Sequence, residues 1–240
     1  MSTTPSPADQ PFSPAKPVSL TERRKAETRM EIARAAAALF VRQGLRATRA
    51  EDIAHTAGIA PRTFYRYFAT KEEAVAPLYA AGAQRWTEAV RTAPAHLGVP
   101  EALEHAVLET LTPGAGVSAA SWEWVRTLIR LTDTSPALRK VWAEVGQASE
   151  GALAQTLAER LAAGDNVASP PEPPTAMAPS LRFAAAVAGA AVRVAVESWA
   201  ATPAPPTGPD GPAALALANL RTLRDFQWAT EPGPDRPEGS

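Results

Sequence analysis

Apolar residues along this chain recur with a helical period, and no stretch alternates as a half-buried strand does. In the first predicted helix, apolar positions at i, i+4, i+7 and i+8 share one face. These positions are Ile32, Ala36, Leu39 and Phe40. Gly44 follows them and suits the C-cap. The pattern continues to about residue 228 and predicts an all-α protein.

Two short helices are predicted directly after the first. Thr48, with Glu51 three residues later, has the form of a capping box that starts a short helix. Gly58 interrupts this helix, and Pro61 suits the first turn of the next one. A long helix, a short helix, a tight turn with glycine and another short helix form the helix-turn-helix arrangement.

The rest of the chain has the pattern of a helical bundle, which brings the total to about nine helices. Thr70 and Glu73 form a second capping box, and the helix they open runs to about Thr92. Further helices are expected at about 101–111, 119–132, 135–164, 180–200 and 213–228. Segment 180–200 is apolar nearly all round, so we expect it to be buried on most faces.

Composition suggests where the ordered parts begin and end. Residues 1–19 and 230–240 are rich in Pro and polar residues and are expected to be disordered tails. Residues 20–71 hold the helix-turn-helix, and residues 72–229 form the helical body. The proline-rich stretch 165–179 is expected to be a loop inside that body.

A net charge of −1 hides an uneven distribution of charge. Residues 21–71 contain eleven Lys or Arg against five Asp or Glu, whereas residues 72–240 contain twelve against nineteen. A basic module joined to an acidic body suggests that only the first part meets a polyanion. A chance scatter of surface charge is the alternative.

Several function classes find no support in the sequence. There is no cysteine, the three histidines do not cluster, and no Gly-rich phosphate loop or nucleophile elbow is present. We therefore predict no enzyme activity, no metal site and no cofactor. The N-terminus lacks the apolar centre of a signal peptide, and no apolar run is expected to reach the length of a membrane span. The expected location is the cytoplasm, without a membrane partner.

The predicted second helix of the helix-turn-helix, from Pro61 to Tyr67, has distinct faces. Phe64 and Phe68 are four residues apart and suit packing beneath the helix. Arg62 can bond guanine edges. The hydroxyl and ammonium groups suit phosphate oxygens; they belong to Thr63, Tyr65, Tyr67 and Lys71. The alternative is an aromatic core with solvated charges.

Segment 21–71 resembles the DNA-binding domain of the TetR family of transcriptional regulators. The resemblance rests on "LFVRQG", "TRAEDIAHTAG", "TFYRYF" and "TKEE", which occur at the family's spacing. It implies base or phosphate contacts for Ala50, Arg62, Thr63, Tyr65, Tyr67 and Lys71. Two positions depart from the family pattern. Ala60 stands where a capping Ser is usual, and Arg49 stands where Ser or Thr is frequent, so Arg49 could contact phosphate instead.

The body resembles the family by layout, and "LIRLTDTSPALRKVWAE" and "FAAAVAGAAVRVAVESWA" are similar to a C-terminal domain type of actinobacterial members. Some of those sense acyl-CoA-like or other apolar compounds. The resemblance implies a homodimer formed by the last two helices and a ligand pocket, for which Trp86 and Trp122 are the candidate walls. Burial of segment 181–199 inside one chain, and core packing of the tryptophans, are the alternatives.

Together these features predict a DNA-binding transcriptional regulator, a repressor that a small apolar ligand releases from its double-stranded operator. The alternative is a helical protein that binds small molecules and has no DNA-binding function. The charged and hydroxyl-rich face of the segment from Pro61 to Tyr67 argues against that alternative.

Overall fold

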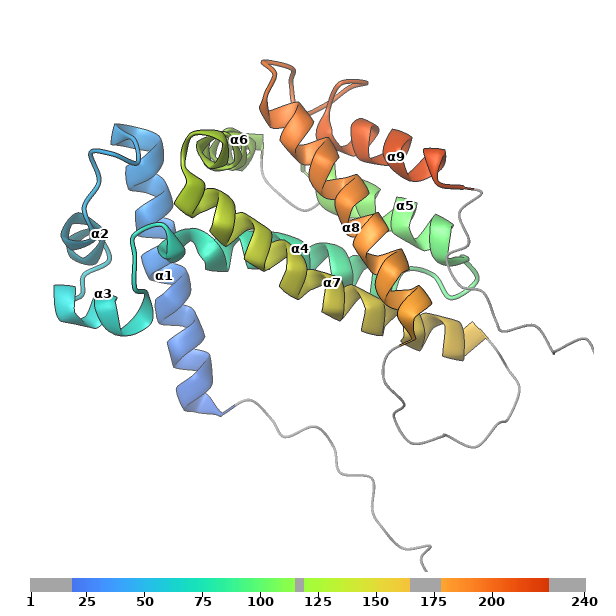
Figure 1. The fold of residues 1–240 in the computed structure, drawn as a ribbon, viewed down its shortest axis with the longest axis horizontal. Coiled ribbons are helices and arrows are strands. Elements are labelled where there is room, and N and C mark those ends of the chain that lie inside the picture. The colour runs from blue at the N-terminus through green and yellow to red at the C-terminus, as the bar shows by residue number, and fades with distance from the viewer. Residues whose placement is uncertain (1–18, 115–118, 165–177, 225–240) are drawn as a thin grey trace, which may run out of the picture.

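The computed structural model describes residues 19–114, 119–164 and 178–224 (Figure 1). Within these ranges the chain forms nine α-helices, one 3-10 turn and no strand, as the sequence predicts. The elements are α1 (Leu20–Gln43), α2 (Ala50–Thr56), α3 (Pro61–Tyr67), η1 (Glu73–Val75), α4 (Ala76–Thr92), α5 (Val99–Leu111), α6 (Ala119–Thr134), α7 (Pro136–Gly164), α8 (Pro179–Ala200) and α9 (Pro212–Thr222). The expected tail 1–19 except Ser19, the expected tail 230–240 and nearly all of loop 165–179 lie outside the described residues.

The three N-terminal helices form one end of an elongated molecule (Figure 1). Helices α4 and α7 pack side by side along the long axis and lead away from that end. Helix α8 packs against α7, and α9 packs against α8 and α5 at the opposite end. Helix α4 therefore connects the helix-turn-helix to the body.

Local sequence signals set several helix ends as predicted. The Gly44 N–H donates to the Phe40 carbonyl at 3.0 Å, and Gly44 has a φ of 84°, a conformation that favours glycine. At the start of α7, the Ser135 hydroxyl accepts the Leu138 N–H at 3.3 Å, and Pro136 takes the first helical position.

The start of α2 differs from the prediction by one residue. Arg49, not Thr48, is the N-cap, and its backbone N–H donates to the Asp52 carboxylate at 2.9 Å. Arginine has no side-chain acceptor, so only this reciprocal half of a capping box can form. The hydroxyl of Thr48 is buried and donates to the Gly44 carbonyl at 2.9 Å, so it secures the preceding turn instead of capping the helix.

Helix α4 also begins differently from the prediction. The Thr70 hydroxyl accepts the Glu73 N–H at 3.2 Å as expected, but the Glu73 carboxylate accepts the Ala69 N–H at 3.0 Å. The turn that follows is the 3-10 turn η1, and regular α-helix begins only at Ala76. A tighter turn of this kind is common at helix starts.

The last helix is shorter than predicted in its described part. Helix α9 ends at Thr222, and residues 223–224 form a turn, whereas a helix to Trp228 was expected. Phe226 and Trp228 lie outside the described residues. The predicted ridge of Leu217, Leu220 and Leu223 packs against this chain's own core, so it is not a free surface.

Two large hydrophobic cores follow from this packing. One lies in the body among α4, α5, α7, α8 and α9, and Leu103, Leu153 and Leu157 are fully buried in it. The other begins among α1, α2 and α3 and continues past the expected boundary at residue 71 to Tyr79 and Leu138. The helix-turn-helix therefore shares buried contacts with the near ends of α4, α6 and α7.

Within a single chain, helix α8 is buried on one side only, so the expected burial on most faces would need a second chain. Its small residues face the core, whereas Phe183 and Val194 remain 61% and 44% exposed. Helix α8 is also long and apolar enough to span a membrane by length and composition alone, so the expectation that no such run exists is wrong. Core helices of water-soluble proteins pass the same test, and α8 packs against α7 and α9.

Candidate functional site

Helix α3 presents two contrasting faces at the tip of the molecule. Phe64 and Phe68 are buried, with ring centroids 5.8 Å apart, so their predicted packing beneath the helix is confirmed. Arg62, Tyr65 and Arg66, at positions i, i+3 and i+4, are exposed and share the outward side. The buried aromatic pair fixes the helix, and the outward side offers donor groups to a partner.

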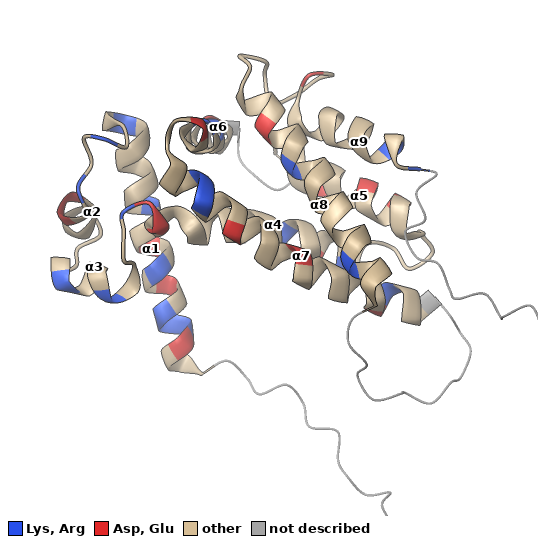
Figure 2. Ribbon diagram, viewed as in Figure 1, with Lys and Arg blue, Asp and Glu red and all other residues tan. Residues whose placement is uncertain are grey.

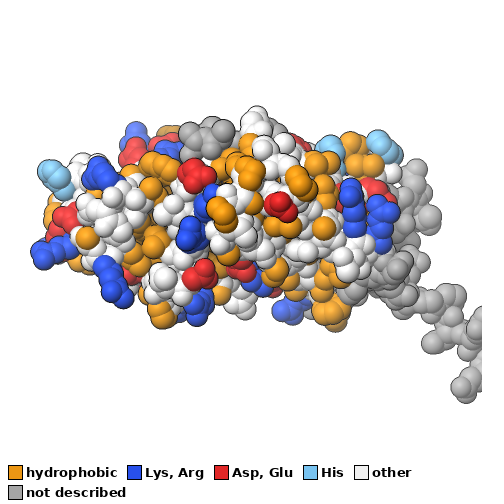
Figure 3. Space-filling model, turned by 90° about the horizontal axis from the view of Figure 1, so that it is seen from above, with side chains coloured by type: hydrophobic (Ala, Val, Ile, Leu, Met, Phe, Trp, Pro, Cys, Tyr) orange, Lys and Arg blue, Asp and Glu red, His pale blue; other side chains and the backbone are white. Residues whose placement is uncertain are grey.

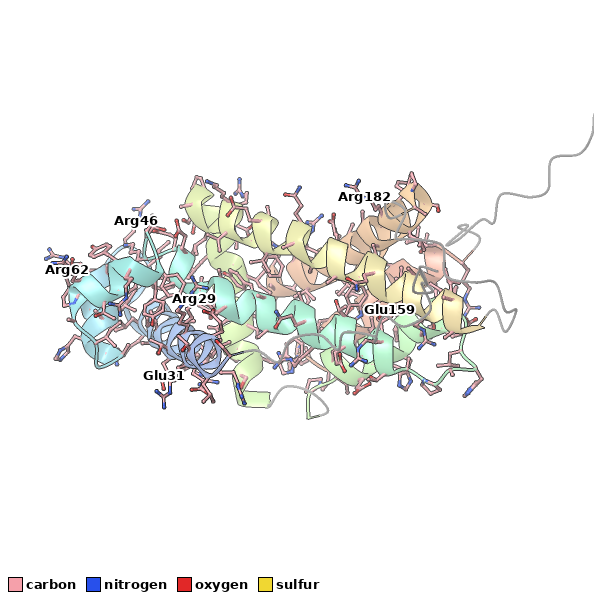
Figure 4. The ribbon with its side chains drawn as sticks, turned by 90° about the horizontal axis from the view of Figure 1, so that it is seen from below. Arg29, Glu31, Arg46, Arg62, Glu159 and Arg182 are labelled. Atoms are coloured by element: carbon pink, nitrogen blue, oxygen red, sulfur yellow. The ribbon has the colours of Figure 1, made fainter. Side chains whose placement is uncertain are left out.

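The environment of α3 adds positive charge to this side. Lys and Arg residues recur on α1, on α3 and in the turn before α2, whereas α8 and α9 carry few charged residues (Figure 2). Arg62 lies at the tip of the molecule and points outward, and Arg46 lies at the same end (Figure 4). The basic residues that are concentrated in the N-terminal part of the sequence are therefore also concentrated at one end of the folded molecule.

The other predicted contact residues belong to α2 and α3 or their caps, and only some of them are exposed. Arg49 is exposed at the N-cap of α2, and Ala50 follows it half-buried. Thr63 and Tyr67 are half-buried on α3. The guanidinium of Arg66 lies 5.4 Å from the centre of the Tyr67 ring, a cation–π distance that holds both side chains together.

Lys71 is engaged within the chain. Its ammonium donates to the carbonyl oxygens of Leu45 and Thr48 at 2.7 and 2.8 Å, so it ties the segment just before η1 to the turn between α1 and α2. An ammonium has three N–H donors, and only the third stays available to a phosphate. Sequence reasoning missed this structural role because the partners are 26 and 23 residues away.

Tyr65 also has a partner that sequence reasoning missed. Its hydroxyl donates to the Glu51 carboxylate at 3.1 Å, although the side chain is 52% exposed. This hydrogen bond and the nearby negative charge raise the pKa of Tyr65 above its ordinary value. While the bond persists, the Tyr65 hydroxyl cannot donate to a phosphate, and a carboxylate lies on the outward side of α3.

A second candidate site is a cavity of about 210 Å³ inside the body. Aromatic rings form much of its wall: Tyr79, Trp86, Trp122 and Trp142. The rings of Tyr79 and Trp142 meet edge to face at 4.9 Å, and Trp122 meets Trp199 in the same way at 5.3 Å. These contacts hold the wall rigid.

The two tryptophans chosen from the sequence both line this cavity. Trp86 is 8% exposed and Trp122 is 2% exposed, and neither indole N–H has an acceptor among the described residues. Glycines from three helices also line the space: Gly82, Gly146 and Gly189. A Cβ at Gly82 or Gly146 would meet no atom within 4 Å, so the missing side chains create part of the hollow.

Polar groups at the cavity connect α7 to α8. The Trp142 indole N–H donates to the Glu197 carboxylate at 2.6 Å, and Arg193 pairs with the same carboxylate at 3.1 Å. Among the described residues no group of three His, Cys, Asp or Glu side chains is placed to hold a metal ion. The mostly apolar and aromatic lining of the cavity suits an organic molecule with a large apolar part.

Hydrophobic side chains also remain on the outer surface of the body. They lie between charged patches over the middle and right of the face seen in Figure 3. On α8, Phe183, Val187, Ala190 and Val194 are spaced as one helical face and are at least partly exposed. Val192 points the other way, toward the cavity and the core.

Comparison with known proteins identifies related sequences and structures. Residues 32–76 match the family described as bacterial regulatory proteins, tetR family. The HTH-type transcriptional regulator TcmR of Streptomyces glaucescens is 32% identical over 162 residues, which cover 65% of this chain and 69% of that protein.

Solved structures share the fold. FadR of Thermus thermophilus, a TetR-family repressor in complex with lauroyl-CoA, has a TM-score of 0.52 at 22% identity, over 88% of this chain and all (100%) of that one. A TetR-family regulator from Rhodococcus sp. has a TM-score of 0.51 at 18% identity, over 82% and 98% of the two chains. At these identities the likeness concerns the fold alone.

Proposed function

Since this chain belongs to the TetR family of bacterial regulatory proteins and is a DNA-binding transcriptional regulator, we propose that it acts as a homodimeric repressor which a small, largely apolar ligand releases from its operator. The observation that carries the proposal is that one helix, α4, begins in the buried core that contains Phe64 and Phe68 of the helix-turn-helix and also lines the cavity. Residues 20–71 then serve as the DNA-binding part, and residues 72–229 as the ligand-binding and dimerisation part. A cytoplasmic location fits this role.

For DNA binding, α3 enters the major groove with its outward side. Arg62, in the first turn, is placed to bond guanine, because the N-terminal residues of a recognition helix reach base edges. Arg49, Thr63 and Tyr67 surround it and suit phosphate contacts. A dimer would place two copies of α3 on a two-fold symmetric site with half-site centres about 34–36 Å apart.

For dimerisation, the exposed face of α8 is the proposed contact. Phe183 and Val194 are large, apolar and exposed, and small residues between them allow close approach of two helices. The outward side of α9, with Ala214 and Ala218, adjoins α8 and would extend the contact. This arrangement supports a helical interface between two copies of the chain.

For ligand response, α4 provides the mechanical link. Its first turns pack with η1 and α1, and its later turns carry Gly82 and Trp86 in the cavity wall. A ligand that fits the cavity better in one position of α4 shifts the dimer toward the matching spacing of the two α3 helices. A coupling free energy of about 1–3 kcal/mol between the two sites is typical of such regulation.

A titration with duplex DNA tests the proposal. The purified chain is titrated with random-sequence duplex at about 50 and 200 mM salt, a range over which phosphate contacts change affinity strongly. We expect binding that weakens with salt, and a further loss in Arg62→Ala. Arg91→Ala, which removes the same charge at the far end of α4, is the matched control. Absence of DNA binding at both salt concentrations would contradict the proposal.

A further inference from the structure

We propose that Glu51 reads a cytosine in the operator through its carboxylate and that Tyr65 holds Glu51 in place for this contact. The inference rests on the proposed binding of DNA by the outward side of α3. It assigns sequence specificity to α2 as well as to α3, and it assigns that role to an acidic residue.

The geometry places the carboxylate on the DNA-facing side. Tyr65 lies between Arg62 and Arg66 on the exposed side of α3, and its hydroxyl is 3.1 Å from Glu51 Oε1. Glu51 is itself exposed in the first turn of α2. The Tyr65 ring meets the buried Phe64 ring edge to face at 5.4 Å, so the tyrosine has a fixed base from which to hold Glu51.

The neighbouring carboxylate is not equivalent. Asp52 is half-buried and already accepts the Arg49 backbone N–H at 2.9 Å. Among the residues that the structure describes, Glu51 accepts one side-chain hydrogen bond, from Tyr65, and a carboxylate can accept about four. Glu51 therefore keeps acceptor capacity on a side of the molecule where the other predicted contacts are donors.

Only a few groups on DNA can donate a hydrogen bond to the Glu51 carboxylate. Phosphates repel it, so its favourable partner must be a hydrogen-bond donor on a base edge. In the major groove the exposed donors are the amino groups of cytosine and adenine. Guanine and thymine present the acceptors O6, N7 and O4, which a carboxylate disfavours.

Cytosine fits better than adenine. The adenine amino group lies beside N7, an acceptor whose lone pair would face the second carboxylate oxygen. On the major-groove edge of a G·C pair the cytosine amino group has an acceptor, guanine O6, on one side only, whereas the adenine amino group lies between two acceptors, N7 and thymine O4. A carboxylate can therefore approach cytosine with less repulsion. Glutamine differs in this respect because its amide donates to N7 while its carbonyl oxygen accepts from the adenine amino group.

Substitution at Glu51 therefore makes a sharp test. The full-length protein and its Glu51→Gln and Glu51→Ala variants each select from a pool of duplexes with about 30 random base pairs, long enough for two half-sites. We expect the wild type to enrich a symmetric motif with one cytosine per half-site. Glu51→Gln should change that cytosine to adenine, and Glu51→Ala should lose the preference there, by about tenfold in relative affinity.

Two controls separate base reading from other effects. Glu31→Gln removes the same charge from the exposed side of α1 and should leave the selected motif unchanged. Tyr65→Phe keeps the ring but frees Glu51, so the cytosine preference should weaken without becoming one for adenine. If both Glu51 variants select the wild-type motif, Glu51 reads no base and the inference is wrong. If the wild type selects no motif, the proposed DNA-binding function itself fails.

Discussion

The hydroxyl of Tyr79 donates to the carbonyl oxygen of Leu128 at 3.0 Å, which bonds α4 directly to α6. Both residues are buried and both line the cavity. The Tyr79 ring also packs on Trp142 of α7. One side chain of the connecting helix thus contacts two helices of the cavity wall, so a ligand that displaces either wall is expected to act on α4.

Removal of this hydroxyl should alter stability in a pH-dependent way. Burial raises the pKa of Tyr79 above its ordinary value near 10. Above pH ~10 the unfolded chain loses this proton while the folded chain keeps it, so the free energy of unfolding falls as pH rises. Tyr79→Phe should cost about 1 kcal/mol at pH ~8 but should show a smaller alkaline loss. Urea unfolding of the wild type and Tyr79→Phe at pH ~8 and above pH ~10 checks this. An equal alkaline loss of unfolding free energy in both proteins would argue against it.

Filling the cavity should abolish ligand response and spare the fold. Gly146 lies in α7 and lines the cavity, with open space at its Cβ position, so Gly146→Leu is expected to place a side chain in the hollow. We expect DNA affinity to be unchanged but its response to apolar compounds to be lost. Tryptophan fluorescence during a screen of acyl-CoAs, fatty acids and hydrophobic drugs measures binding.

Gly151→Leu is the matched control for this prediction, because Gly151 lies in the same helix with equally open space but does not line the cavity. Both substitutions replace glycine within a helix, where other residues are favoured by about 0.5–1 kcal/mol. A ligand response that survives in Gly146→Leu would place the ligand elsewhere.

Lys71 should affect stability as well as DNA binding. Lys71→Met keeps the aliphatic stem but removes the donors to the Leu45 and Thr48 carbonyls, so we expect a loss of roughly 2 kcal/mol in the free energy of unfolding. If the third N–H meets a phosphate, the salt dependence of DNA binding should also fall by about one unit of slope. A loss of stability with unchanged salt dependence would make Lys71 purely a tether.

Two neighbouring valines on α8 should behave differently. Val194 is exposed, so Val194→Asp is expected to separate the dimer into folded monomers, because an unpaired charge is costly in an apolar interface. Val192 packs against this chain's own cores, so Val192→Asp should lower the melting temperature instead. Sedimentation velocity and thermal unfolding distinguish the two effects. A folded wild-type monomer at micromolar concentration would contradict the proposed dimer.

Sequence reasoning predicted the features that depend on neighbouring residues. Gly44 ends α1 and Ser135 starts α7 because each signal acts within a few positions. It placed the cap of α2 at Thr48 because a capping box and a turn-securing hydroxyl have the same sequence. It also could not predict that Tyr65 meets Glu51, or that Lys71 meets Leu45, because only the folded chain brings these distant pairs together.

The same limit applies to the body. The apolar pattern of 180–200 predicts a helix that avoids water, but it does not tell which face packs on α7 and which is exposed in a single chain. Trp86 and Trp122 were chosen because aromatic residues recur on the middle helices, and both line the cavity. The three glycines of its wall carried no distinctive sequence signal, since each also suits a helix–helix contact.

Those glycines have an evolutionary consequence. Exchange of Gly82 or Gly146 for alanine would cause no clash and would favour the helix by about 1 kcal/mol each. Random substitution should therefore tend to close the hollow, unless something that occupies it is under selection. The same positions also offer a simple route to new responses, because single substitutions can reshape the space in small steps without disturbing the remote end of the molecule that meets DNA.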